Sequence, residues 1–235
     1  MSDGRQRLIV ALDMPSVEEA RALIPKLGDS VGVYKIGLEL LFAGGFDLTG
    51  ELVRDGHAVF IDAKLLDIEA TVERATAAIA RTGAQFLTVH AVDRKTLDAA
   101  VRGRGESGLK LLGVTVLTNL RPADLVQQGI DLAPAELVLH RAMLAREAGF
   151  DGVIASGQET AAIRNAAGAD FLIMTPGIRP KGLEAHDQAR TMTPADAIMS
   201  GADYLVIGRP ITRAADPRAA AHAITEEIAR ATCRG

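Results

Sequence analysis

The spacing of one short charged motif suggests acid–base chemistry. Asp62, Lys64 and Asp67 form an Asp-x-Lys-x-x-Asp pattern at the end of an otherwise apolar run. Residues two apart on a strand point to the same side, so Asp62 and Lys64 are predicted to lie together. Lys35 stands inside another apolar run and would balance the charges of this set. A lysine withdrawn from water stays protonated when carboxylates flank it, so the set could hold a proton donor at a fixed point.

Each of these residues also has a simpler explanation. Asp62 and Lys64 could form an ordinary structural ion pair, and Asp67 could be only the N-cap of the helix that follows. Asp13, at the end of the first apolar run, could be a turn residue, and His90 could be satisfied by backbone groups. Chemistry is favoured because the charges of the first three runs are predicted to fall at one end of the fold. The five histidines show no ligand spacing, so we expect no metal site.

A second group of residues, nearer the C-terminus, is suited to binding an anion. Gly208 and Arg209 directly follow the apolar run Tyr204–Ile207. Glycine permits close approach of the backbone, and arginine adds a forked donor that is always charged. Arg179 lies in the segment 174–193, whose unusual length predicts a loop that closes over a phosphate. The alternative is that Arg209 is a surface arginine and Gly208 a turn.

Short apolar runs recur along the 235 residues and are predicted to be strands. Most are continuously apolar rather than alternating, as expected of parallel strands buried on both faces. The runs are Leu8–Leu12, Val31–Ile36, Ala58–Ala63, Phe86–His90, Lys110–Val116, Gly152–Ala155, Phe171–Met174 and Tyr204–Ile207. Predicted helices are one from a Ser16–Glu19 capping box to Leu27, then Ile68–Arg81, Ala135–Ala148, Glu159–Ala167, Pro194–Met199 and Pro217–Arg230.

Eight strand-like runs, each followed by a helix or a short helical stretch, favour a (β/α)8 TIM barrel that forms a single domain over residues 1–235. The main alternative is a doubly wound open sheet, but no Gly-x-Gly-x-x-Gly follows the first run. In a barrel the chemistry lies at the carboxyl ends of the strands, and the loops after the last two strands often bind phosphate. Asp62, Lys64 and Arg209 stand at such positions.

The composition limits the partners that the protein could have. Apolar residues make up 48% and charged residues 24%, with a net charge of −4, which argues against nucleic acid as a partner. Aromatic residues are only 3%, without Trp, which argues against base stacking or membrane anchoring. The single Cys233 excludes an intramolecular disulfide. The first apolar run is too short for a signal peptide or a membrane span, so we expect a cytoplasmic protein.

Several of these segments together resemble one family, orotidine 5′-phosphate decarboxylase. The resemblance runs from Leu8 to about Thr212, nearly the whole chain. Its segments are Ala11-Leu12-Asp13, Tyr34-Lys35-Ile36-Gly37, Asp62 to Ile68 with Thr71, Val114 to Thr118, Thr175 to Pro180 with Gln188, and Ile207 to Ile211. The chain departs from the common family pattern at Leu66, Glu69 and Ala70, none of which the family uses for chemistry.

The resemblance implies decarboxylation of orotidine 5′-monophosphate to uridine 5′-monophosphate, without a metal or another cofactor. Lys64 would donate a proton to C6 of the pyrimidine, and Asp62 would lie against the substrate carboxylate. Asp13 and Lys35 would bind ribose hydroxyl groups and complete the charged array. A preplaced ammonium in a dry pocket would stabilise the negative charge that carbon dioxide leaves at C6.

The resemblance also implies a homodimer and a set of substrate contacts. Asp67 and Thr71 would reach a ribose in the neighbouring subunit, so that each site would need both chains. Thr118 would contact the pyrimidine. The phosphate would be held by Arg179, Gln188, Gly208 and Arg209.

Three other functions compete with this one. Sugar-phosphate decarboxylases and hexulose-phosphate synthases share the Asp-x-Lys-x-x-Asp pattern, but they use magnesium and typically carry an acidic residue where Lys35 stands. A nucleotide-binding barrel without catalysis would lack a member of the Asp–Lys set, and none is missing here. A Schiff-base aldolase would need a readily deprotonated Lys64, which the neighbouring carboxylates oppose.

Overall fold

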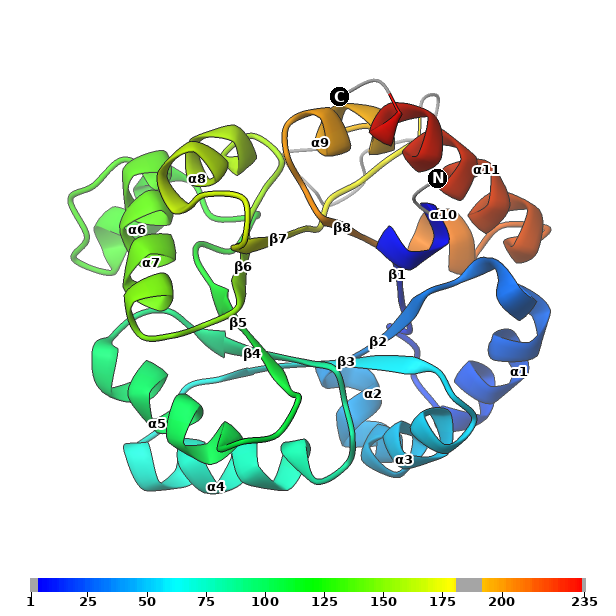
Figure 1. Ribbon diagram of the computed structural model, residues 1–235, viewed down its shortest axis with the longest axis horizontal. Coiled ribbons are helices and arrows are strands. Elements are labelled where there is room, and N and C mark those ends of the chain that lie inside the picture. Colours follow the sequence, from blue (N-terminus) through cyan, green and yellow to red (C-terminus); the bar gives the residue numbers. More distant parts are fainter. Residues whose placement is uncertain (1–3, 181–191, 234–235) are drawn as a thin grey trace.

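A closed barrel of eight parallel strands forms the centre of the protein (Figure 1). The structure is a computed structural model, and it describes residues 4–180 and 192–233. Each strand pairs with the next in sequence order, and the last pairs with the first. The strands are β1 (Leu8–Ala11), β2 (Val33–Gly37), β3 (Ala58–Leu65), β4 (Phe86–His90), β5 (Lys110–Val114), β6 (Gly152–Ile154), β7 (Leu172–Thr175) and β8 (Tyr204–Ile207). The predicted (β/α)8 TIM barrel is confirmed.

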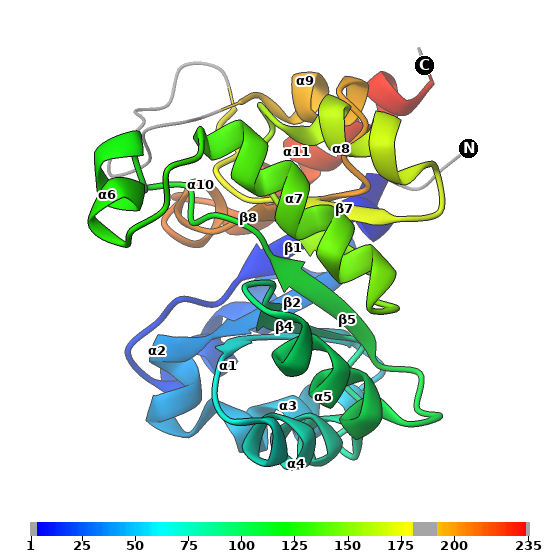
Figure 2. The same cartoon turned by 90° about the vertical axis from the view of Figure 1, so that its left-hand side faces the viewer.

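Helices surround the barrel and connect its strands (Figure 1). They are α1 (Val17–Leu27), α2 (Leu38–Leu40), α3 (Phe46–Arg54), α4 (Glu69–Ala80), α5 (Arg94–Arg104), α6 (Pro122–Gln127), α7 (Pro134–Glu147), α8 (Thr160–Ala167), α9 (Pro194–Met199), α10 (Arg209–Thr212) and α11 (Pro217–Thr232). Short 3-10 turns are η1 (Gly4–Arg7) and η2 (Gly28–Ser30), and η3 (Leu41–Gly45) is a π-helical turn. Figure 2 shows α2, α6 and α10 at the end of the barrel to which the strands point. No helix in this part of the chain is long and apolar enough to cross a membrane.

Two predicted helix starts have different outcomes. The Ser16 side chain accepts a hydrogen bond from the Glu19 N–H at 3.2 Å, which confirms it as the cap of α1. Asp67 is not the N-cap of α4, because that helix begins at Glu69 and its N-cap is Ile68. The Asp67 carboxylate instead accepts from the adjacent Ile68 N–H at 2.6 Å.

The barrel interior is a separate apolar layer, distinct from the core between strands and helices. Ile9, Val33, Phe60, Phe86 and Leu112 point inward and pack together with Met174. Side chains alternate along a strand, so the residue two positions further toward the carboxyl end also points inward. On β2, β3 and β4 those residues are Lys35, Asp62 and Thr88. The interior is therefore apolar at the bottom and polar at the top.

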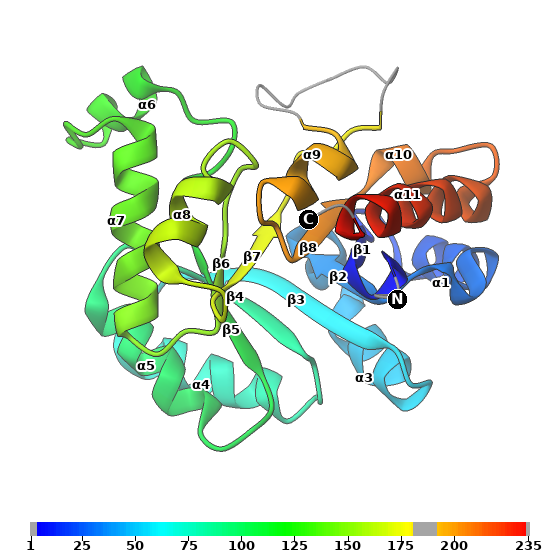
Figure 3. The ribbon, with the colours of Figure 1, turned by 45° about the horizontal axis from the view of Figure 1, so that its top comes forward.

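The two ends of the described chain meet on one side of the barrel. Figures 1 and 3 show η1 beside α11. Gly4 permits this approach, since a Cβ there would lie 2.2 Å from the Thr225 carbonyl oxygen. The last helix thus packs against the segment that leads into the first strand.

Candidate active site

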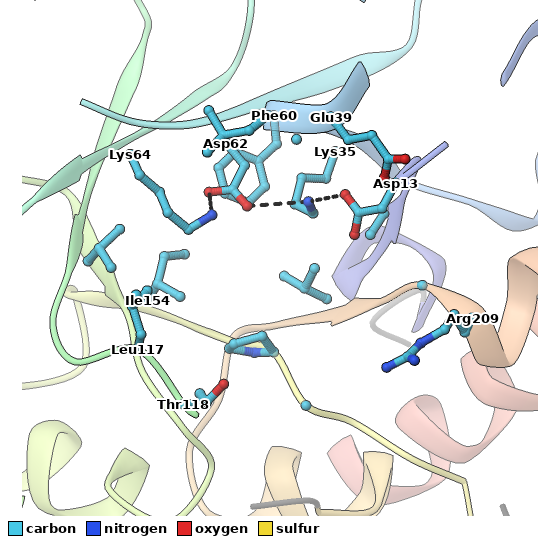
Figure 4. A pocket seen from close by; sticks show the side chains of 18 of the residues that line it. Asp13, Lys35, Glu39, Phe60, Asp62, Lys64, Leu117, Thr118, Ile154 and Arg209 are labelled. Carbon is cyan, nitrogen blue, oxygen red and sulfur yellow. Dashed lines mark hydrogen bonds and ion pairs between the residues drawn. The ribbon is translucent and has the colours of Figure 1, made fainter. Parts of the chain in front are cut away.

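A cavity of about 520 Å³ opens at the carboxyl ends of the strands (Figure 4). Its wall combines charged side chains with an apolar surface made by Phe60, Val114, Ile154 and Val206. These four residues come from β3, β5, β6 and β8, so the barrel itself forms the base of the pocket. An apolar base excludes water and strengthens the electrostatic interactions above it.

Four of the charged residues predicted from the sequence form one continuous array in this cavity. Lys35 Nζ lies 2.8 Å from Asp13 Oδ1 and 3.3 Å from Asp62 Oδ2. Lys64 Nζ lies 2.7 Å from Asp62 Oδ1. Figure 4 shows the alternation of acid and base along this line. The array contains two ammonium groups and two carboxylates, so its charges balance within a single chain.

Burial and charge act in opposite directions on the two most enclosed members of the array. The side chains of Lys35 and Asp62 are only 8% and 12% exposed. Burial alone would lower the pKa of Lys35, but the charges and hydrogen bonds of Asp62 and Asp13 outweigh it and raise that pKa. Burial would raise the pKa of Asp62, but Lys35 and Lys64 outweigh it and lower that pKa. Both residues are therefore ionised at neutral pH.

Lys64 reaches Asp62 by an irregular backbone and not by a regular strand. The pairing of β3 with β4 shifts between Ile61 and Leu65. Lys64 adopts a left-handed backbone with φ of 48°, which costs a non-glycine residue about 1 to 2 kcal/mol. The prediction that Asp62 and Lys64 lie together is thus fulfilled, although strand alternation is not its cause.

A buried threonine that the sequence analysis did not select lies beneath this pair. Thr88 Oγ1 lies 2.9 Å from Asp62 Oδ1 and also accepts from the Lys64 N–H at 2.9 Å. The sequence does carry a signal for it. Thr88 is a polar residue in the middle of the run Phe86–His90, two positions after the inward-facing Phe86.

His90, at the end of β4, is half-buried near the same array. Burial lowers its pKa, and the charges of Lys64 and Arg141 lower it further. The imidazole is therefore neutral at neutral pH and adds no charge to the array.

The opposite side of the cavity carries the predicted anion-binding residues. Arg209 points into the pocket across from the array, and Thr118 lies near Leu117 on the side of the pocket that faces Arg209 (Figure 4). Arg179 and Gly208 also line the cavity. Gln188 lies outside the described residues, as does most of the predicted closing loop 174–193.

Two predicted site residues lie away from this cavity in their own chain. Asp67 is exposed and Thr71 is half-buried on α4, and neither is among the described residues that line the pocket. Two charged residues that were not predicted as site residues do line it, Glu39 and Arg213. Figure 4 shows Glu39 beside Asp13. Glu39 lies in the short helix α2, two residues beyond the end of β2, where the sequence predicted no site residue.

The fold and this pocket define the protein as a TIM-barrel protein with a charged pocket at the carboxyl ends of its strands. Among the described residues, no group of three or more His, Cys, Asp or Glu side chains is arranged to hold a metal ion. Comparisons with known proteins identify the family within this class. The chain matches the family described as Orotidine 5'-phosphate decarboxylase / HUMPS family over residues 6–224.

Similar proteins agree with that match over almost the full chain. The orotidine 5'-phosphate decarboxylase of Rhodopseudomonas palustris (strain BisB5) is 53% identical over 228 residues, covering 97% of both chains. That of Methylobacterium radiotolerans is 52% identical over 229 residues, covering 97% of this chain and 99% of the relative. The crystal structure of orotidine 5'-phosphate decarboxylase from Lactobacillus acidophilus matches with a TM-score of 0.83 and 38% identity, covering 94% of this chain and 98% of that chain. The chain belongs to the orotidine 5'-phosphate decarboxylase / HUMPS family, which confirms the resemblance seen in the sequence.

Gly37 at the end of β2 gives the first prediction, because the array depends on its lack of a side chain. A Cβ at this position would lie 2.6 Å from Asp13 Oδ1 and 2.8 Å from Lys35 Nζ. We expect Gly37→Ala to separate these two groups and to lower the free energy of unfolding by roughly 1 to 3 kcal/mol. Urea denaturation and a crystal structure of the variant measure both effects.

Gly108→Ala is the matched control, since a Cβ at Gly108 has no neighbouring atom within 4 Å. A Gly37→Ala protein as stable as this control, with the contact between Lys35 and Asp13 unchanged, would contradict the prediction.

Proposed function

We propose that this protein decarboxylates orotidine 5′-monophosphate to uridine 5′-monophosphate, the last step of the de novo synthesis of uridine 5′-monophosphate. The observation that carries the proposal is the Lys64 ammonium 2.7 Å from the buried Asp62 carboxylate, inside a pocket with an apolar base. Membership of the family and the arginines on the opposite side of the pocket support it.

In the proposed reaction Lys64 is the proton donor. The bond between C6 and the carboxylate breaks, carbon dioxide leaves, and the electron pair stays on C6. The Lys64 ammonium stabilises this developing charge, and then transfers its proton to C6. Asp62 lies where the substrate carboxylate would approach, so it repels the bound substrate more than a product-like transition state. Lys64 regains a proton from solvent after the product leaves.

The remaining members of the site bind and orient the nucleotide. We assign Asp13 and Lys35 to ribose hydroxyl groups and Thr118 to the pyrimidine. We assign the phosphate to Arg179, Gln188, Gly208 and Arg209. The loop 174–193, which begins beside Arg179, is proposed to close over that phosphate, so that binding energy far from C6 helps to order the site.

A homodimer is the second part of the proposal. The residues beside Asp67 carry large apolar side chains in water, with Leu66 54% and Ile68 72% exposed. Exposed apolar groups of this size often mark a protein interface. A partner subunit that covers Leu66 and Ile68 would also contact Asp67 and Thr71, which do not line the pocket of their own chain.

We propose that neither a metal nor another cofactor takes part. Magnesium would supply positive charge in the related magnesium-dependent barrels, whereas here Lys35 and Lys64 supply it. Lys35 stands where those relatives typically carry an acidic residue. The proposed substrate and product are water-soluble nucleotides, and this supports a cytoplasmic location.

The assay that tests the function follows the ultraviolet absorbance of orotidine 5′-monophosphate with the purified protein. We expect turnover that is unchanged by a metal chelator. Parallel incubations with hexulose and pentulose phosphates, with and without magnesium, test the related barrels. Turnover of a sugar phosphate that stops on adding chelator would overturn the proposal.

Replacing the proposed proton donor separates chemistry from binding. We expect Lys64→Ala to lose nearly all turnover, because no other ammonium lies at that position, and still to bind uridine 5′-monophosphate. Turnover is measured by absorbance and binding by calorimetry. Lys95→Ala, which removes an exposed lysine on α5, is the control and should behave as the unmodified protein. Near-normal turnover in Lys64→Ala would exclude the role assigned to Lys64.

Mixing two inactive variants tests whether Asp67 acts across a dimer. Lys64→Ala and Asp67→Ala are each expected to be nearly inactive. In a two-fold symmetric dimer formed by exchange, one site of each mixed pair has both residues intact, so about a quarter of the full activity should return. Sedimentation measures the dimer itself. A mixture that exchanges subunits and stays inactive would contradict the shared site.

A further inference from the structure

Thr88 holds a central position beneath the charged array. It lies in the middle of β4, and its side chain is fully buried. Its single hydroxyl group is hydrogen-bonded to both members of the reactive pair, at 2.9 Å from Asp62 Oδ1 and 2.9 Å from the backbone nitrogen of Lys64. No other described hydroxyl group contacts both of these residues.

The local backbone explains why a hydroxyl group is needed there. Ile61 pairs with Leu87 and Leu65 pairs with Val89, so three residues of β3 stand opposite Thr88 alone. In such a bulge the extra residues lose their partners in the ladder. The Lys64 N–H therefore has no ladder carbonyl at this point, and a buried N–H without an acceptor is costly. The Thr88 hydroxyl replaces the missing carbonyl.

The direction of both hydrogen bonds follows from the chemistry of the groups. A backbone N–H can only donate, and an ionised carboxylate can only accept. Thr88 Oγ1 must therefore accept from Lys64 and donate its one proton to Asp62. The same Asp62 oxygen also binds Lys64 Nζ at 2.7 Å. The backbone and the side-chain end of Lys64 are thus joined through one carboxylate oxygen and one hydroxyl group.

We propose that Thr88 is a positioning residue for the reaction, and that its hydroxyl group sets the location of the Lys64 ammonium. It acts through the left-handed backbone of Lys64 and through the orientation of Asp62, and it does not touch the substrate. Thr88 suits this role because a β-branched side chain in a packed strand has few rotamers, so its hydroxyl direction is well defined. The consequence for catalysis rests on the proposed function, whereas the consequence for geometry does not.

Thr88→Val tests the hydroxyl group alone, because valine has nearly the same shape. The substitution leaves the Lys64 N–H without its acceptor and removes the hydrogen bond that Thr88 donates to Asp62 Oδ1. We expect kcat to fall roughly 10- to 100-fold, as a displacement of about 1 Å at the reacting group would cause. The affinity for uridine 5′-monophosphate, held mainly through ribose and phosphate, should stay within about twofold. Thr88→Ser, which keeps the hydroxyl group, should retain most of the turnover.

Thr49→Val is the matched control. Thr49 is also a fully buried threonine, but it lies on α3 and its hydroxyl donates to the Gly45 carbonyl. Any general cost of removing a buried hydroxyl group should appear in the thermal stability of this variant without a change in kcat. Equal turnover of Thr88→Val and Thr49→Val would overturn the proposal, as would a Thr88→Ser protein that is as slow as Thr88→Val.

A crystal structure of Thr88→Val separates this proposal from the proposed function. If the unmodified protein does not turn over orotidine 5′-monophosphate, the function fails and the geometry is still measured. We expect the φ angle of Lys64 to leave the left-handed region, and the contact between Lys64 Nζ and Asp62 to lengthen. An unchanged Lys64 in that structure would overturn the positioning role whether or not the protein is an enzyme.

Discussion

Asp62 lies between two ammonium groups at the mouth of the barrel, and the charges of this site depend on one another. Burial alone would raise the pKa of a carboxylate at this depth and lower the pKa of a lysine. Lys35 at 3.3 Å and Lys64 at 2.7 Å lower the pKa of Asp62, and Asp62 in turn raises the pKa of Lys35. Removing one partner would leave an uncompensated buried charge, so the array behaves as a unit. The backbone features around it, the glycine at Gly37 and the bulge of β3, are the ones that allow these distances.

Much of the barrel was predictable because its strands are buried on both faces, which produces continuous apolar runs with little ambiguity. Inward-facing positions then follow by alternation, and this places Lys35 and Asp62 at the top of the interior above Val33 and Phe60. The segment from Leu38 to Arg54 was not predicted to be helical. Gly44, with a left-handed backbone, interrupts it and divides one helical region into α2, η3 and α3.

The part of the site that escaped prediction depends on the pairing of neighbouring strands. Nothing in the residues of β3 alone reveals that the register shifts at Asp62, because a bulge is defined only with its partner strand. The roles of Thr88 and Gly37 have the same origin. In the sequence both look like ordinary strand residues. In the structure Thr88 Oγ1 lies 2.9 Å from Asp62 Oδ1, and a Cβ at Gly37 would lie 2.6 Å from Asp13 Oδ1. Asp67 and Thr71 follow β3 in the sequence, and only the structure shows that they do not line the pocket of their own chain.

The division of the pocket into two electrostatic regions explains how a balanced array can serve an anionic substrate. The array carries two positive and two negative groups, so by itself it does not attract an anion. In the proposed reaction, the arginines Arg179 and Arg209 supply the attraction from the other side of the pocket. A phosphate bound there would bring the rest of the nucleotide against Asp62 despite the repulsion between two carboxylates. In this proposal the binding energy at the phosphate would offset the unfavourable contact at Asp62, and the repulsion would disappear only as carbon dioxide leaves.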